Sequence, residues 1–190
     1  MNIFPTPIHL AKINEDTTYL QNLILDLQCK DEGRIVSNRG GWQSQPISHH
    51  LITNLLINIM SQVATYIAPF KIKSDMSLQF TQVWANINTK HDYNINHLHS
   101  GFISGVYYIK TPPNSGKLIF HNPDKVQSIL WHTENFDTIT DETSLTFEIT
   151  PEPDLLVLFP AHLEHSVSQN NNDESRLSIS FNMSLTHAGD

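Results

Sequence analysis

The sequence predicts a mainly β domain with N-terminal helices, an α+β arrangement in which a β-sandwich or barrel carries the helices on one side. Two amphipathic helix patterns occupy the first part of the chain. From Met76 onward the segments are short, rich in β-branched and aromatic residues, and separated by Pro, Gly, Asn and Asp. No internal repeat or linker divides the 190 residues. We therefore expect one domain over 1–190, with a helical part at 1–75 and a β core at 76–184.

Two helices are predicted in the first part. The first follows Asp16, a residue type that caps helix N-termini. Its apolar stripe comprises Leu20, Leu23, Ile24 and Leu27. Ser48 is the predicted cap of the second helix, which ends near Pro69. The apolar face of that helix comprises Ile52, Leu55, Leu56, Ile59, Val63 and Ile67.

The segment between these helices, SNRGGWQSQP at 37–46, is predicted to be a loop because it holds two glycines and a proline. The favoured interpretation is a turn in which Trp42 packs as a plug. The alternative is a substrate-contact loop, in which Trp42 and Arg39 would reach the substrate.

The β part is predicted to contain strands near 77–88, 103–110, 116–121, 127–131, 144–149, 154–160 and 164–169. A last strand begins at Arg176 and alternates strictly between apolar and polar side chains. Alternate side chains of a strand point to opposite faces, so one face belongs to the core. The polar face comprises Arg176, Ser178, Ser180 and Asn182. By itself this pattern is that of an ordinary solvated face.

Composition excludes several classes of protein. Asp and Glu total 19 against 11 Lys and Arg, a formal net charge of -8, which argues against nucleic-acid binding. Cys29 is the single cysteine, so no intrachain disulfide or cysteine-rich zinc module can form. The start of the chain lacks a secretory signal pattern, and polar residues interrupt the apolar stretch 51–67. We expect a cytoplasmic protein that does not bind membranes.

The 11 histidines provide the candidate metal ligands. His97 and His99 are two residues apart, and in an extended segment both imidazoles would lie on one face. His162 and His165 follow a predicted strand and could deliver a further ligand, as in metal sites of jelly-roll proteins. Taken alone, each of these signals is weak.

Four ordered blocks within 76–184 resemble the 2-oxoglutarate and Fe(II)-dependent oxygenases, in particular a bacterial and phage branch near the prolyl-hydroxylase-like enzymes. The blocks are TQVWANIN leading to YNINHLHS, SGVYYIK with SGKLIFHNPD, PDLLVLFPAHLEHSV, and RLSISFN. The resemblance implies a double-stranded β-helix (jelly-roll, cupin-like) core. It also implies Fe(II) as metal and 2-oxoglutarate as cosubstrate.

The resemblance assigns roles to individual residues. His97 matches the first metal ligand, His165 the distal one, and Arg176 the arginine that binds the far carboxylate of 2-oxoglutarate. Tyr108 and Asn86 match positions that contact the cosubstrate in related enzymes. The residues that share the face of Arg176, and so are expected to line the pocket, are Ser178, Ser180 and Asn182.

The sequence departs from the family at His99, where an Asp or Glu is usual. Our favoured ligand set is His97, His99 and His165, which still leaves coordination positions open. The alternative is that a carboxylate completes the site, with Asp92, Asp124 or Glu164 as candidates.

Two further histidines have open roles. His162 is interpreted as a structural residue or a neighbour of the ligands. His121 either contacts the substrate or is exposed on a hairpin strand.

The resemblance implies a non-haem iron oxygenase that hydroxylates its substrate and releases succinate and CO2. The alternatives are a cupin-like three-histidine dioxygenase or isomerase that does not use 2-oxoglutarate, and a non-catalytic jelly-roll binding module. The expected partner is a small-molecule or peptide substrate, with a homodimer as the candidate assembly. The sequence does not identify the substrate.

Overall fold

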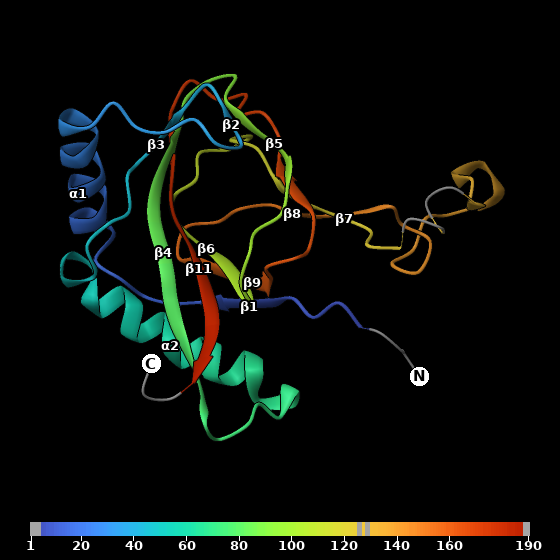
Figure 1. The fold of residues 1–190 in the computed structure, drawn as a ribbon. Helices are drawn as coiled ribbons and strands as arrows, with labels where there is room; N and C mark the ends of the chain where they lie inside the picture. Colours follow the sequence, from blue (N-terminus) through green and yellow to red (C-terminus); the bar gives the residue numbers. More distant parts are fainter. Residues whose placement is uncertain (1–4, 125–126, 128–129, 188–190) are drawn as a thin grey trace.

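The computed structural model describes residues 5–124, 127 and 130–187, whose strands form two antiparallel sheets (Figure 1). The six-stranded sheet comprises β1 (His9–Lys12), β9 (Leu155–Pro160), β6 (Ile103–Lys110), β11 (Arg176–His187), β4 (Met76–Asn88) and β3 (Trp42–Gln43), in that order. The five-stranded sheet comprises β2 (Asn38–Arg39), β5 (Tyr93–His97), β10 (His165–Val167), β7 (Leu118–His121) and β8 (Thr146–Ile149). From β4 onward the chain crosses repeatedly between the two sheets, which confirms the predicted jelly-roll architecture.

Two α-helices cover the outer face of the six-stranded sheet (Figure 1). They are α1 (Thr17–Lys30) and α2 (Thr53–Ile67), and the short 3-10 helices η1 (His49–Leu51) and η2 (Ala68–Phe70) flank α2. A third 3-10 helix, η3 (Thr133–Asn135), lies in the segment between β7 and β8. The predicted N-cap Asp16 is confirmed, because its side chain accepts a hydrogen bond from the Tyr19 backbone N–H. The predicted cap Ser48 is wrong: its hydroxyl bonds the His50 ring instead, and η1 precedes α2. No helix of the described residues is long and apolar enough to cross a membrane.

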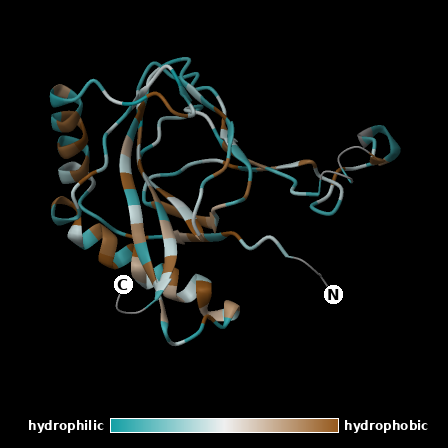
Figure 2. Cartoon of the chain, in the orientation of Figure 1, coloured by the Kyte–Doolittle hydropathy of each residue, from teal (hydrophilic) through white to brown (hydrophobic). Residues whose placement is uncertain are grey.

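The six-stranded sheet is buried on both faces. Its outer face packs against α1 and α2 in the larger apolar core, and its inner face lines a smaller core between the sheets. Along β11 the apolar residues face the helices, so Arg176 and the alternate residues after it face the interior. Figure 2 shows this alternation as hydrophobic and hydrophilic bands along β4 and β11. The polar face of the last strand is therefore interior, because the helices bury the opposite face.

The structure also differs from the expected strand list. The strands β1, β2 and β3 lie within 1–75, where only two helices and a loop were expected, and each is too short to give a sequence pattern. The predicted strand at 127–131 is wrong, since the Trp131 N–H bonds the Gln127 carbonyl as in a helical turn. Residues 128–129 of that prediction lie outside the described residues.

The segment between β2 and β3 joins the two sheets on one side. β2 pairs with β5 in one sheet, whereas β3 pairs with β4 in the other. Gly40 and Gly41 make the connection with positive φ angles of 67° and 65°. A Cβ on Gly40 would lie 2.0 Å from an Asp92 carboxylate oxygen, so only glycine fits there.

Candidate active site

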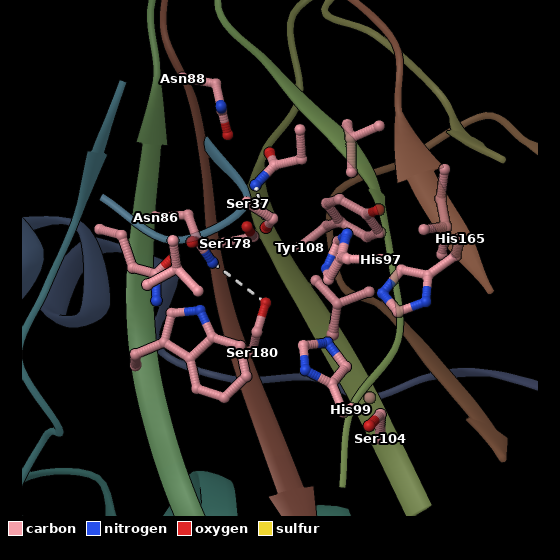
Figure 3. Close-up of a pocket in the computed structure, with 18 of the residues that line it drawn as sticks. Ser37, Asn86, Asn88, His97, His99, Ser104, Tyr108, His165, Ser178 and Ser180 are labelled. Atoms are coloured by element: carbon pink, nitrogen blue, oxygen red, sulfur yellow. Dashed lines mark hydrogen bonds between the residues drawn. The ribbon is translucent and has the colours of Figure 1, made fainter. Parts of the chain in front are cut away.

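Three histidines converge between the sheets (Figure 3). His97 ends β5 and His165 begins β10, and the two residues are directly opposite each other in the strand pairing. His99 follows two residues later, where its backbone N–H donates to the Ala161 carbonyl at 2.9 Å. Sequence-distant segments thus bring the three predicted ligands together.

The geometry of the three imidazoles suits a metal ion. One ligand nitrogen from each ring lies within 4.8 Å of the others, and the ring centroids are 4.3 to 5.1 Å apart. Among the described residues, no carboxylate joins a group of this kind. The candidates Asp92, Glu164 and Asp124 instead accept hydrogen bonds from Thr89, Asn96 and the Gln127 backbone, respectively.

Hydrogen bonds orient two of the rings. His97 Nδ1 lies 2.7 Å from the Ile95 carbonyl and His165 Nδ1 lies 2.8 Å from the Leu163 carbonyl. A carbonyl oxygen only accepts, so each Nδ1 carries the proton and each Nε2 presents a lone pair. Carbonyl contacts of this type fix metal-ligating histidines in many proteins.

The surroundings keep the cluster neutral. Burial, with the neighbouring histidines adding to it, lowers the pKa of the His165 imidazole to about 3. Burial and the nearby His97 lower the pKa of His99 to about 4, and burial also lowers the pKa of His97. Neutral imidazoles are the form that binds metal.

A β-bulge in β5 helps to line the cavity. Between the pairs His97–His165 and Asn94–Val167, β5 has one more residue than β10. Asn94 and His97 therefore both border the cavity although they are three residues apart. Strict strand alternation would have placed them on opposite faces.

Arg176 borders the same cavity and is only 2% exposed. Its guanidinium donates to the Ser115 carbonyl at 2.7 Å and to Asn88 Oδ1 at 2.9 Å, while the buried Nε has no partner among the described residues. Burial lowers the pKa of this guanidinium, and the neighbouring Tyr108 and Asp92 oppose that shift. Among the described residues, the hydrogen-bond partners of Arg176 are neutral, and a buried cation held in this way is prepared to bind an anion.

The other predicted cosubstrate residues lie around Arg176. Asn86 donates to Ser180 Oγ at 3.0 Å, and Tyr108 and Ser178 border the cavity with them (Figure 3). Burial raises the pKa of the Tyr108 hydroxyl, so it stays protonated. Asn182 accepts a hydrogen bond from Ser104 at 2.7 Å and does not itself border the cavity.

The predicted substrate residues do not border this cavity. Trp42 packs in the larger core and its indole N–H donates to the Asp31 carbonyl at 2.9 Å, as favoured for a plug. Arg39 is exposed and bonds the Val36 and Asn38 carbonyls. His121 contacts Ser166 Oγ and borders a separate cavity, because it lies one residue beyond the strand position opposite His165.

Sequence reasoning missed several cavity residues. Asn88 and Trp84 alternate with Asn86 along β4, so the period of the strand could have identified them. Trp84 lies 5.8 Å from His99 between ring centroids. Ser37 directly precedes β2 and Gln43 ends β3, and no local sequence pattern marks either one as a cavity residue.

Comparison with known proteins adds to these observations. A family model described as "Putative 2OG-Fe(II) oxygenase" matches residues 82–182, more than half of the chain. That segment includes the three histidines and Arg176. No curated protein matches the sequence.

Several solved structures share the fold. The viral collagen prolyl hydroxylase of Paramecium Bursaria Chlorella virus-1 has 13% identity and a TM-score of 0.61, with 93% of this chain and 94% of that chain covered. A Pseudomonas putida prolyl-4-hydroxylase has 15% identity and a TM-score of 0.58, with coverage of 97% and 94%. HygX from Streptomyces hygroscopicus, solved with nickel and 2-oxoglutarate bound, has 11% identity and a TM-score of 0.61, with coverage of 94% and 83%.

These likenesses confirm the double-stranded β-helix fold. The family match goes further, because it identifies the class of enzyme, with Fe(II) as metal and 2-oxoglutarate as cosubstrate. By that match over residues 82–182, the chain belongs to the 2OG-Fe(II) oxygenase family.

Proposed function

We propose that this oxygenase holds Fe(II) with His97, His99 and His165 and binds the distal carboxylate of 2-oxoglutarate with Arg176. One observation carries the proposal: a three-histidine cluster borders the same cavity as a buried arginine that forms no ion pair with a described residue. The first group suits a metal ion and the second suits a carboxylate.

The donor set fits Fe(II) in type and in protonation state. Imidazole is an ordinary ligand of iron, and three protein ligands leave further coordination positions free. With neutral ligands only, the site keeps the full charge of the ion, whereas a carboxylate would cancel part of it. We therefore expect weaker retention of Fe(II) than in a site with two histidines and a carboxylate.

Bound iron and 2-oxoglutarate supply the oxidation, in which O2 and the cosubstrate are consumed and succinate and CO2 are released. Arg176 orients the cosubstrate through its distal carboxylate. Tyr108 is protonated and buried beside it, so its hydroxyl can donate to the same carboxylate. The apolar side chains Val106 and Phe159 border the cavity and limit the access of water.

We further propose hydroxylation of a C–H bond in a small-molecule or peptide substrate, in which one atom of O2 enters the new hydroxyl group and the other enters succinate. The enzyme of this proposal is a single domain over 1–190, with the helical part at 1–75 supporting the jelly-roll core at 76–184. Cytoplasmic location and homodimer formation stay predictions.

The test uses anaerobic protein loaded with Fe(II). Addition of 2-oxoglutarate should produce a visible charge-transfer band, and admission of O2 should then release succinate. The His97→Ala and Arg176→Ala variants provide matched controls, since the first removes a proposed metal ligand and the second removes the proposed carboxylate ligand. Metal-loaded protein that gives neither band nor succinate would overturn the proposal and favour a three-histidine enzyme with another reaction.

A further inference from the structure

We propose that Asn88 is a positioning residue, which holds the Arg176 guanidinium in place while leaving its positive charge available to the cosubstrate. This inference rests on the proposed function of Arg176. It assigns to Asn88 the selection of 2-oxo acids that carry a second carboxylate over those that carry an apolar end.

The protein holds the Arg176 guanidinium through few hydrogen bonds. Of its two hydrogen bonds to protein, one goes to the Ser115 carbonyl and the other to the side-chain oxygen of Asn88, at 2.7 and 2.9 Å. Guanidinium has five N–H donors, so most of them remain for a ligand. Among the described residues, Asn88 is the only one whose side chain accepts a hydrogen bond from Arg176.

Arg176 and Asn88 are both buried in the interior. Arg176 is 2% exposed and Asn88 is 3% exposed. Buried charges are normally paired, because an uncompensated charge in the interior is costly. Asp92 is the acidic residue whose charge acts on Arg176, but it accepts from the Thr89 backbone N–H at 2.6 Å and from the Thr89 hydroxyl at 2.7 Å. Arg176 forms no ion pair with a described residue, so the charge of Asp92 offsets this cost only in part and from outside hydrogen-bond contact.

The backbone fixes Asn88 opposite Arg176. The two residues pair directly between β4 and β11, and the Asn88 carbonyl accepts a hydrogen bond from the buried Asn170 side chain at 3.0 Å. An aspartate at this position would have nearly the same shape and could accept the same hydrogen bond. It would also neutralise Arg176 and place a negative charge where the distal carboxylate is proposed to bind. The neutral amide keeps the orientation and avoids both effects.

The key test compares Asn88→Asp with wild type. Protein loaded with Co(II), which binds without turnover, is titrated with 2-oxoglutarate and separately with 2-oxopentanoate, which has a methyl group in place of the distal carboxylate. We expect Asn88→Asp to weaken 2-oxoglutarate binding by about 10- to 100-fold, because the added charge opposes the contact between Arg176 and the distal carboxylate. This range is the one expected for loss of hydrogen bonds between charged groups. Binding of 2-oxopentanoate should change by less than about threefold, which is well under 1 kcal/mol.

Thermal unfolding of the metal-free protein is the second readout. Because Asn88→Asp supplies a partner for a buried cation, its Tm should equal or exceed that of wild type. A purely structural role for Asn88 would instead lower the Tm and weaken both ligands together. Asn94→Asp is the matched control, since it adds the same charge to the cavity wall at a residue that bonds Ser37 and not Arg176. This control should reduce the preference for 2-oxoglutarate less than Asn88→Asp does.

The outcomes are separable. If the ratio of the two affinities is the same in Asn88→Asp as in wild type, whether or not both affinities fall, the proposed role of Asn88 is overturned. Wild-type protein that binds both acids equally well overturns the proposed function of Arg176 itself. If Asn88→Asp does not fold, Asn88→Leu removes the hydrogen bond without adding charge. A selective loss of 2-oxoglutarate binding in that variant supports the proposal, and no selective loss refutes it.

Discussion

Replacing Arg176 with methionine tests the proposed cosubstrate site most directly. Methionine is unbranched and fills a similar path through the interior, so it avoids the large cavity that alanine would leave. Arg176 uses two of its five N–H donors on protein acceptors, and a carboxylate can engage two of the remaining three. Loss of that contact should cost about 2–3 kcal/mol of binding free energy, net of the exchange with water.

This cost corresponds to an increase of about 30- to 150-fold in the dissociation constant of 2-oxoglutarate. Isothermal titration of Co(II)-loaded protein measures it, and metal content checks that the histidine cluster is intact. Metal binding should be retained, because Arg176 is not in the group of ligand nitrogens. A dissociation constant within about threefold of wild type, with metal bound, would refute the assignment of Arg176 to the distal carboxylate.

Three other predictions address the ligand set, the packing between β6 and β11, and the role of Trp42. His99→Ala should reduce the iron retained after dialysis, and His99→Asp should restore it by supplying a carboxylate ligand; equal iron in wild type and His99→Ala, measured by elemental analysis, would exclude His99 as a ligand. Gly105→Ala should destabilise the protein by about 1–3 kcal/mol, because the added Cβ would lie 2.4 Å from a ring carbon of Phe181; an unchanged denaturant midpoint would contradict this packing. Trp42→Phe should lower the Tm, since it removes the hydrogen bond to the Asp31 carbonyl, while 2-oxoglutarate affinity stays the same. A loss of 2-oxoglutarate affinity without a change in Tm would contradict the structural role of Trp42.

Much of the fold could be predicted from sequence patterns. Helical periodicity identified α1 and α2, strict alternation identified β11, and β-branched and aromatic content identified β4 and β6. These long elements are predictable because each one presents a continuous apolar face to the core. Strands of two to four residues, such as β2 and β3, are stabilised by their pairing partners and leave no local pattern.

In the candidate site, the proposed ligands could be predicted from the sequence, whereas several of the residues around them could not. The order of the histidines and Arg176 in recognisable blocks nominated them as ligands before any geometry was known. Their neighbours depend on pairing across the sheets, as Asn88 does opposite Arg176 and Asn94 does at the bulge in β5. His121 shows the limit most clearly, because its position in a family-like block does not fix which face of β7 it occupies.

By itself, then, the sequence determined the class of fold, the candidate ligand types and their order along the chain, since these follow from periodicity and residue chemistry. Only the tertiary structure decided that the polar face of β11 is interior. That outcome requires the two helices to cover the opposite face. Likewise, whether Arg176 finds an acidic partner depends on which residue a distant strand places beside it, and β4 places the neutral Asn88 there.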